Sequence, residues 1–533
     1  MREFFKTKDC YILLFFYTIS NLLLLLNYDG VFWDDWVTYN QSFETLKIMY
    51  EEIQFVLIGS FATLLTRIGN QVFPFRFYIF VFGFLNGVFL YQILKSLNLF
   101  DRNSVFFLTM LFLVVPLFGG KNAMTPYGLP VFCYYFGFYI LTIYFENPRL
   151  WKRALALLLF YCSFSLNSFL VFYFFAGAYI YYMVWKQNGK KFFKSSYLTI
   201  LKYPDFLILP IAYFLVKTIF FVPYGDYVGY NEVKTEGVLN SFPLLVASFD
   251  FSYLYLFESS WQISKIFWPI ILVVAGLLSL HQRKFKNYSY WTIAYFLFGA
   301  FAFALAAFPY TVVGKLPMST NFNSRHQALL PLGAAFMTYM SVIGISQLVG
   351  VRKKITLATL WFIILLFVGN NIHLSYRFHK DNFYQVSLQE NMKDNKLIRE
   401  KTTFLAVNQL GSNLVYDRPI DYYEWSGHLK KIFNDETRLM VSVEFLDRLD
   451  FTLKVQKYKQ NNFSNWTQSE PYLVTISPKQ SLNKREFLYL FYLHLFDKAL
   501  FREKCKPLTE ISVQKYVGKD WFKIARGLKN ENI

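Results

Sequence analysis

Two adjacent carboxylates, Asp34 and Asp35, follow the first long apolar segment, within the stretch G-V-F-W-D-D-W-V-T-Y-N from 30 to 40. Neighbouring carboxylates repel each other, so one can act as a base near neutral pH while the other stays ionised and holds a cation or an acceptor group. We favour Asp34 as the base and Asp35 as a structural or cation-binding group, with Mg²⁺ or Mn²⁺ as the cation. Trp33 and Trp36 flank the pair as candidate substrate-binding residues that would fix its depth at a membrane interface. The alternative is a solvated loop that begins with ordinary interfacial aromatics.

A second group of polar residues is the S-R-H motif at 324 to 326, which is preceded by Lys315. The guanidinium of Arg325 has a planar fork that suits bidentate phosphate binding, and His326 can donate to a phosphate or titrate near neutral pH. Together they form a candidate anion site. The alternative is an arginine that extends its charge to the membrane surface beside a histidine that caps the next helix.

Two further basic residues, Lys121 and Arg76, are weaker substrate-binding candidates, because an interfacial anchor explains each of them better. The sequence has no phosphate-binding glycine loop, no C-x-x-C and no H-E-x-x-H. Nucleotide hydrolysis and zinc chemistry are therefore unsupported.

Composition places these residues in a membrane protein. Of the 533 residues, 55% are hydrophobic and 21% aromatic, and only 17% are charged, below the roughly one quarter of soluble domains. The net charge of +19 would indicate nucleic acid in a soluble chain, but much of the excess lies in short loops between apolar segments, where it sets orientation. We therefore exclude a nucleic-acid partner. The four cysteines are scattered, which excludes a disulfide framework and a zinc knuckle.

Eleven apolar segments are candidates for transmembrane helices, if a few are allowed to be shorter than about 20 residues. They lie near 10–27, 75–95, 104–118, 127–146, 153–167, 169–185, 204–222, 264–280, 290–308, 328–349 and 355–372. With a cytoplasmic N-terminus, every inside loop is basic, as the positive-inside rule requires. The basic residues of these loops are Lys95, Arg102, Arg149, Lys152, Arg153, Lys186, Lys190, Lys191, Lys194, Arg283, Lys284, Lys286, Arg352, Lys353 and Lys354.

The predicted fold is an all-α polytopic membrane domain of about eleven helices, followed by a small soluble α/β domain. The membrane domain covers 1–372 and includes an outside loop with an interfacial helix at 28–74. An extracytoplasmic domain covers 373–533, where T-F-L-A-V and Y-L-V-T-I-S are strand-like and a helix spans about 484–503. The sequon asparagines Asn462 and Asn465 also lie in this domain, although sequons arise by chance.

This order of features resembles the GT-C class of integral membrane glycosyltransferases, which includes the protein mannosyltransferases and the lipid A aminoarabinose transferases. The resemblance rests on one span, the acidic motif just outside it, an interfacial helix, and an arginine at the entry to the second span in F-P-F-R-F-Y-I-F-V-F-G. It implies that an acidic residue of the first outside loop, here Asp34 or Asp35, is catalytic. It also implies a polyprenyl-phosphate sugar as donor, whose phosphate basic residues of later outside loops hold; we assign that role to Arg325 and His326. The motif reads D-D-W, where D-E or E-E is common in related enzymes.

Three functions are consistent with these features. The first is a glycosyltransferase of the bacterial inner (plasma) membrane that moves a sugar from a lipid-linked donor to an extracytoplasmic glycan, lipid or protein. The second is a transporter or flippase, which should place ionisable residues near the midplane of the membrane. The third is an inactive scaffold with the same architecture. The distinctive charges of this chain lie at outer helix ends, and the clearest polar residues within the spans are Asn86, Asn167 and Lys217, which favours the enzyme.

Overall fold

The structure is a computed structural model that describes residues 2–222, 224, 233, 235–280, 291–435, 437–445 and 471–517. Its contacts divide the chain into two compact units. Unit 1 comprises Met1–Leu25, Lys47–Leu65 and Phe75–Leu374, and unit 2 comprises Leu26–Leu46, Thr66–Pro74 and Ser375–Ile533. Arg283, Lys284, Lys286, Asn462 and Asn465 lie outside the described residues.

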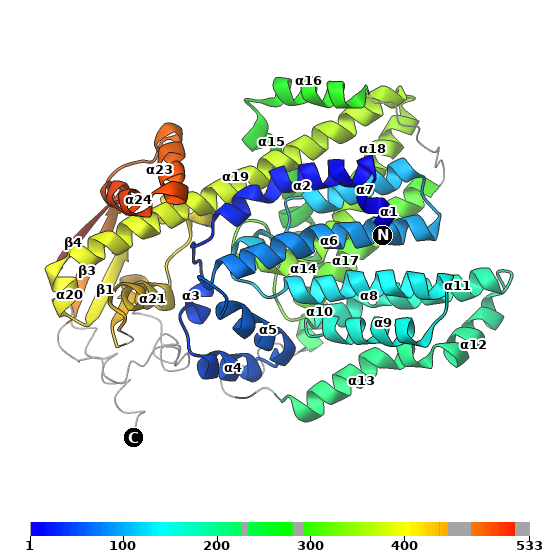
Figure 1. Ribbon diagram of the computed structural model, residues 1–533, viewed down its shortest axis with the longest axis horizontal. Coiled ribbons are helices and arrows are strands. Elements are labelled where there is room, and N and C mark those ends of the chain that lie inside the picture. The colour runs from blue at the N-terminus through cyan, green and yellow to red at the C-terminus, as the bar shows by residue number, and fades with distance from the viewer. Residues whose placement is uncertain are drawn as a thin grey trace. The chain divides into compact units, whose positions relative to one another are not determined.

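Unit 1 is built from helices, which Figure 1 shows in blue to yellow-green. The elements up to α19, apart from α3, are α1 (Arg2–Phe5), α2 (Lys8–Leu26), α4 (Phe43–Glu52), α5 (Val56–Thr66), α6 (Phe73–Leu97), α7 (Arg102–Val114), η1 (Gly119–Asn122), α8 (Gly128–Glu146), α9 (Leu150–Ser163), α10 (Ser168–Phe172), α11 (Phe174–Gln187), α12 (Phe192–Lys202), α13 (Pro204–Phe220), α14 (Thr235–Ser248), η3 (Phe249–Leu254), α15 (Tyr255–Ser264), α16 (Trp268–Ser279), α17 (Trp291–Thr311), η4 (Phe322–Gln327), α18 (Leu330–Leu348) and α19 (Lys353–Asp394).

The predicted multi-pass membrane architecture is confirmed. Within the described residues, six helices are long and apolar enough to cross a membrane, and up to eight if each of two bent helix pairs counts as one span. Each of the eleven predicted segments coincides with a helix or a helix pair. Some of these helices are short: α7 has 13 residues and α9 has 14, fewer than the about 20 of a full crossing. The count of eleven crossings therefore stays a prediction.

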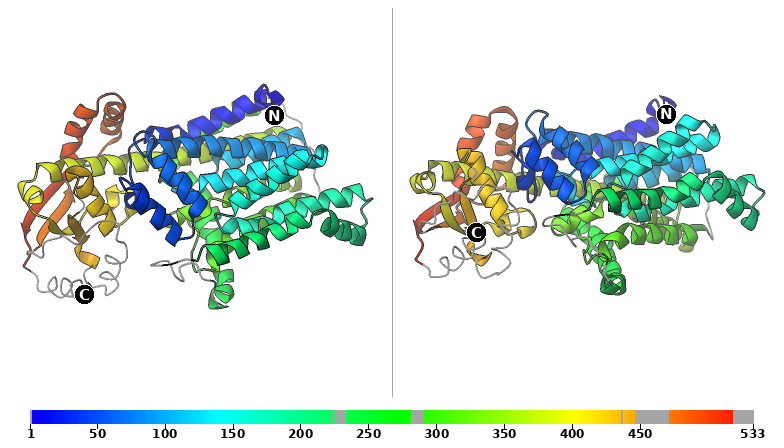
Figure 2. Two further views of the ribbon diagram at one scale, coloured as in Figure 1. Left: turned by 60° about the horizontal axis from the view of Figure 1, so that its bottom comes forward. Right: turned by 90° about the horizontal axis from the view of Figure 1, so that it is seen from below.

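Close helix packing in unit 1 depends on small residues. α17 and α18 lie side by side, as do α8 and α9 (Figures 1 and 2). A Cβ added at Gly333 of α18 would lie 2.5 Å from the backbone nitrogen of Phe303, and one added at Gly299 of α17 would lie 2.8 Å from Phe336 Cβ. Because neither glycine carries a side chain, the two backbones approach closely, as is common between membrane helices.

The segment predicted as a single interfacial helix within 46–70 forms two helices, α4 and α5. The chain turns between them at Gln54, whose φ is +62°. α5 then packs against α4, since a Cβ added at Gly59 would lie only 2.2 Å from Tyr50 Cβ. With 11 residues, α5 is too short to cross a bilayer, which agrees with the expectation that this segment does not span it.

Unit 2 is a four-stranded sheet with helices. The strands are β1 (Thr403–Asn408), β2 (Leu439–Ser442), β3 (Tyr472–Pro478) and β4 (Thr509–Lys515), in the order β2-β1-β3-β4. β1 pairs in parallel with β2 and β3, and β3 pairs antiparallel with β4. The helical elements are α3 (Asp35–Thr38), α20 (Lys396–Glu400), η5 (Gly411–Asn413), η6 (Val415–Asp417), α21 (Tyr422–Phe433), η7 (Val443–Phe445), α23 (Lys484–Phe496), α24 (Lys498–Cys505) and η9 (Lys506–Leu508).

The predicted α/β character of the C-terminal part is confirmed, because both strand-like runs form strands. The predicted helix at 484–503 is divided into α23 and α24 at Asp497, whose side chain accepts from Leu500 N–H and so starts the second helix. One difference concerns α19: the span predicted to end at 372 continues without a break to Asp394. No proline or glycine pair interrupts the chain there, so one helix of 42 residues forms.

Candidate active site

The aspartate pair lies on a tight turn of unit 2 that Asp35 holds closed. The carboxylate oxygen Oδ2 of Asp35 accepts a hydrogen bond of 3.1 Å from Phe32 N–H, and Asp35 N–H donates to Phe32 O at 3.0 Å. Between them Trp33 adopts a φ of +51°. Asp35 is only 4% exposed and begins the short helix α3. Its side chain is therefore part of the local backbone structure, as expected for the structural member of the pair.

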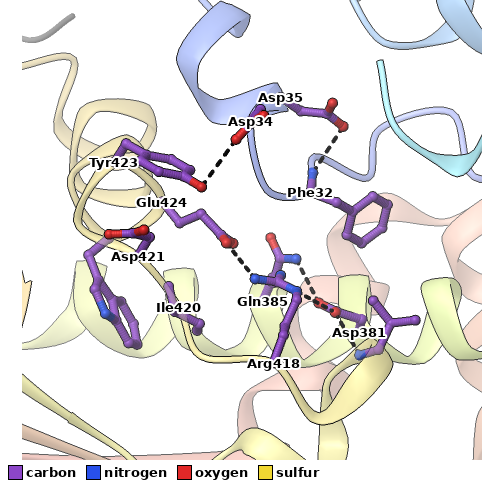
Figure 3. A network of polar contacts seen from close by, with 12 residues as sticks. Phe32, Asp34, Asp35, Asp381, Gln385, Arg418, Ile420, Asp421, Tyr423 and Glu424 are labelled. Carbon is purple, nitrogen blue, oxygen red and sulfur yellow. Dashed lines mark hydrogen bonds and ion pairs between the residues drawn. The ribbon is translucent and has the colours of Figure 1, made fainter. Parts of the chain in front are cut away.

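Asp34 has a different environment, because its side chain is exposed. Its Oδ1 accepts a hydrogen bond of 3.2 Å from Tyr423 Oη, from the first turn of α21 (Figure 3). The pKa of the Tyr423 phenol lies well above its ordinary value because of burial, and because the charges of Asp34, Asp421 and Glu424 oppose its ionisation. Tyr423 therefore stays protonated and orients the Asp34 carboxylate without neutralising it.

A buried ionic network lies beside this hydrogen bond (Figure 3). Arg418, 6% exposed, pairs with Glu424 and lies with its Nε 3.5 Å from Asp381 Oδ2. Asp381 also accepts from Val415 N–H at 2.9 Å and from Gln385 Nε2 at 2.7 Å. Burial raises the pKa of Glu424 to about 8, although Arg418 acts in the opposite direction. Glu424 therefore keeps its proton to a higher pH than an ordinary carboxyl group.

The two tryptophans are packed inside unit 2. The Trp33 ring stacks on Tyr416 at 5.8 Å, with the guanidinium of Arg418 5.7 Å from its centroid. The Trp36 ring lies 4.3 Å from His428, and it is so close to α21 that a Cβ on Gly427 would fall 2.6 Å from Trp36 Cε3. The interpretation of these rings as interfacial anchors is therefore replaced by one in which they attach the D-D turn to the C-terminal part of the chain.

The basic candidates are grouped in unit 1, around η4. The guanidinium carbon of Arg325 lies 3.8 Å from the Phe322 ring centroid, and the His326 ring lies 4.6 Å from the Tyr310 ring. Burial, and then the charge of Arg325, lowers the pKa of Lys315 to about 8. Lys315 and Arg325 therefore lie close enough for their charges to interact.

His326 does not titrate near neutral pH. Burial, followed by the charges of Arg325 and Lys315, lowers the pKa of its imidazole to about 2. Of the two properties expected of this residue, hydrogen bonding to an anion therefore remains, and titration near pH 7 does not.

The loop that carries Lys121 packs directly against this basic group. A Cβ added at Gly120 would lie 2.9 Å from Arg325 Cα, and Phe118 N–H donates to Gln327 Oε1 at 3.2 Å. The Lys121 ammonium donates to the side-chain oxygens of Asn21 and Asn371, at 2.9 and 2.7 Å. Burial lowers its pKa to about 8. Lys121 thus joins α2, η1 and α19 as well as adding positive charge near Arg325.

Arg76, the remaining basic candidate, is fully buried in the first turn of α6. The structure therefore brings Lys315, Arg325, His326 and the Lys121 loop together within unit 1, and it brings Asp34 and Asp35 together with Tyr423 within unit 2. That Asp34 and Arg325 face one common cavity stays a prediction.

Comparisons with known proteins give a similarity in structure and none in sequence. No protein-family model and no curated protein matches the chain. Among solved structures it is similar to ArnT from Cupriavidus metallidurans, in a crystal structure of that protein bound to undecaprenyl phosphate. The match covers 91% of this chain and 95% of that chain, with 13% sequence identity and a TM-score of 0.33.

The candidate site was also considered as a place where a metal ion could bind. Among the residues that the structure describes, no group of three or more His, Cys, Asp or Glu side chains could hold a metal ion. Mg²⁺ is often held by only one or two carboxylates together with substrate phosphates, and Asp34 offers an exposed carboxylate for such a site. Asp35 is less suited, because its Oδ2 already accepts the Phe32 N–H.

The sequence did not reveal Tyr423, the hydrogen-bond partner of Asp34, or the ionic network that lies beside it. Tyr423, Arg418, Glu424 and Asp381 all come from the C-terminal part of the chain. The only local signal was their charge and polarity next to the apolar residues of R-P-I-D-Y-Y-E-W, since Arg and Glu are rarely buried unless paired.

Proposed function

We propose that this protein is a membrane glycosyltransferase that moves a sugar from a polyprenyl-phosphate donor to an extracytoplasmic acceptor. The observation that carries the proposal is that the two aspartates have different environments. Asp35 is buried and closes its own turn, whereas Asp34 is exposed and oriented by a neutral phenol. A carboxylate that is held in place by a hydrogen bond and open to solvent has the geometry required of a general base.

In the proposed reaction, Asp34 removes the proton of an acceptor hydroxyl as its oxygen attacks the anomeric carbon. The new C–O bond forms while the bond from that carbon to the donor phosphate oxygen breaks, and the phosphate leaves with the electron pair. A single displacement of this kind inverts the anomeric carbon. Arg325 and Lys315 stabilise the charge that develops on the leaving phosphate, and neutral His326 donates a hydrogen bond to it.

The proposal places the N-terminus in the cytoplasm and the D-D turn outside, in a bacterial inner membrane, where a lipid-linked donor supplies the activated sugar. The polar residues within predicted spans, which a transporter would need, include Lys217 and Asn167. Lys217 Nζ donates to Asn167 Oδ1 at 2.6 Å, so these two groups satisfy each other. This pairing favours the enzyme over the transporter.

The test is turnover of a panel of polyprenyl-phosphate sugars by the purified protein in proteoliposomes. We expect Asp34→Asn to lower turnover by about 10²–10⁴-fold, the usual contribution of a general base. Asp35→Asn should have a much smaller effect, because the Asn oxygen can still accept the Phe32 N–H. Asp394→Asn, which alters only an ion pair with Lys506 on the surface, is the matched control. Full turnover by Asp34→Asn would refute the catalytic assignment and favour an inactive scaffold.

A further inference from the structure

The helix α23 of unit 2 has apolar residues on two opposite sides. One side belongs to the core of unit 2: Phe487, Leu490 and Leu493 are 6%, 4% and 4% exposed. The other side is uncovered, and its residues are Leu488, Tyr489, Tyr492 and Phe496, with exposures of 64%, 49%, 58% and 73%. Because residues four apart lie on the same face of a helix, these side chains form one apolar stripe. Scattered single apolar residues are normal on a surface, but a continuous stripe marks an interaction site.

The residues that α23 packs against lie close in the sequence to the end of a predicted span. The Phe487 ring lies 4.4 Å from Tyr376, and the Phe491 ring lies 5.0 Å from His379. Both partners belong to α19, whose second half lies beside α23 and α24 (Figure 1). The apolar run of α19 ends near Ile372. Tyr376 is four residues further along, which corresponds to about 6 Å at the rise of 1.5 Å per residue.

The other end of α23 is held near a second exit from the membrane. The Tyr28 hydroxyl donates to the backbone oxygen of His494 at 2.7 Å, and the two rings stack at 4.8 Å. Lys498, which follows α23, has its ammonium 4.6 Å from the Tyr28 ring centroid. Tyr28 is two residues beyond Leu26, the last residue of α2 and the end of the first predicted span. Both attachment points of α23 are therefore within a few residues of the end of an apolar helix.

Basic residues flank the apolar stripe at both of its ends. Lys484 and Arg485 are exposed one turn before the stripe, and Lys498 and Arg502 are exposed beyond its other end. The neighbouring acidic residues act as helix caps: Glu486 accepts from Asn483 N–H at 3.1 Å, and Asp497 accepts from Leu500 N–H at 3.0 Å. A basic-flanked apolar stripe that contains two tyrosines is typical of a helix that lies in a membrane interface.

We propose that α23 lies in the membrane interface, with its apolar stripe among the acyl chains and its basic flanks on anionic lipid headgroups. The C-terminal unit is then a membrane-attached domain, and not a soluble domain held only by its connections. Because α21 and the D-D turn belong to the same unit, the attachment also limits how far Asp34 can move from the surface where a lipid substrate would lie. This proposal does not depend on the proposed function.

The test uses the full chain in nanodiscs of equal parts phosphatidylglycerol and phosphatidylcholine. Single cysteines at Leu488→Cys, Tyr492→Cys and Phe496→Cys carry a nitroxide label, and collision rates with oxygen and with a water-soluble nickel chelate are measured. Ser512→Cys, exposed on β4, is the matched control. We expect an oxygen-to-nickel collision ratio several-fold higher at the three stripe positions than at the control, since oxygen concentrates in lipid and the chelate in water.

Two results would overturn the proposal. Stripe labels as accessible to nickel as the control would show that the stripe faces water. Labels shielded from both reagents would show that protein covers it, either another part of this chain or a second copy. A charge variant gives an independent check: Lys484→Glu with Arg485→Glu should lower the ratio at Tyr492→Cys in anionic nanodiscs and have less effect in nanodiscs of phosphatidylcholine alone. An equal effect in both would contradict the role of anionic headgroups. All of these measurements are independent of sugar transfer, so they stand even if the enzymatic assignment fails.

Discussion

Tyr423 donates a hydrogen bond of 3.2 Å to Asp34, although the two residues are 389 positions apart in the chain. The contact joins the loop that follows α2 to the C-terminal helix α21 within one compact unit. The C-terminal unit thereby contributes directly to the environment of the proposed base, as a positioning element.

The first prediction is that Tyr423→Phe lowers kcat and leaves KM nearly unchanged. The substitution removes the hydroxyl that orients Asp34 and keeps the ring, so packing is conserved. A hydrogen bond to a charged group contributes about 1.5–3 kcal/mol, and only part of this is lost from the transition state, so we expect a loss of about tenfold. Steady-state kinetics in proteoliposomes measure it, with Tyr472→Phe in β3 as the control. A rise in KM at constant kcat would instead assign Tyr423 to substrate binding.

The second prediction concerns the buried network around Arg418. Arg418→Met leaves Asp381 and Glu424 buried without their shared cation, and breaking such a network typically costs about 3–5 kcal/mol of folding free energy. Thermal unfolding of the detergent-solubilised protein should show a clear fall in Tm. Lys396→Met is the control, because its ion pair with Glu400 is exposed and exposed pairs contribute about 0–1 kcal/mol. An unchanged Tm in Arg418→Met would contradict the charge argument.

The third prediction follows from the pKa of Glu424, which is raised from 4.5 to about 8 by burial. Between these two values the folded state holds a proton that the unfolded state has released. The free energy of unfolding therefore falls as pH rises through this window, with a slope of at most about 1.4 kcal/mol per pH unit from this group. Glu424→Gln should flatten the pH dependence of Tm between pH 5 and 8. An unchanged slope in the variant would show that another group causes it.

Much of the architecture could be predicted from the sequence, because runs of apolar residues report directly on membrane helices and alternating apolar residues on strands. The break between α4 and α5 could not, since it depends on a positive φ at Gln54, a residue type that gives no turn signal. The continuity of α19 could not be predicted either, because the polarity of the sequence changes along this helix although its helical geometry does not.

The candidate site was predicted only in its local parts. The D-D motif was visible because both carboxylates follow an apolar segment within a few residues. Tyr423 was not, because no short-range pattern relates two residues that tertiary structure alone brings together. The roles of Trp33 and Trp36 were misread for the same reason: an aromatic residue beside a span is usually an anchor, and its packing on Gly427 or Tyr416 exists only in the folded unit.

The last prediction concerns the basic group of unit 1. Arg325→Ala should raise KM for the lipid-linked donor and lower kcat, because the guanidinium would bind the phosphate in the ground state and stabilise its growing charge in the transition state. Arg325→Lys should recover little, since an ammonium cannot make a bidentate contact. Arg352→Ala, exposed between α18 and α19, is the control.

His326 provides the sharper test of the same group. Because its pKa is lowered to about 2, the imidazole is neutral throughout the pH range in which the enzyme would work. His326→Gln keeps a neutral hydrogen-bond donor, so it should lower turnover modestly and leave the shape of the pH–rate profile between pH 5 and 8 unchanged. His326→Ala should cost more, since it removes the donor as well. If the wild type has a limb near pH 6.5 that disappears in His326→Gln, the histidine titrates and acts by charge, and the neutral role assigned to it is wrong.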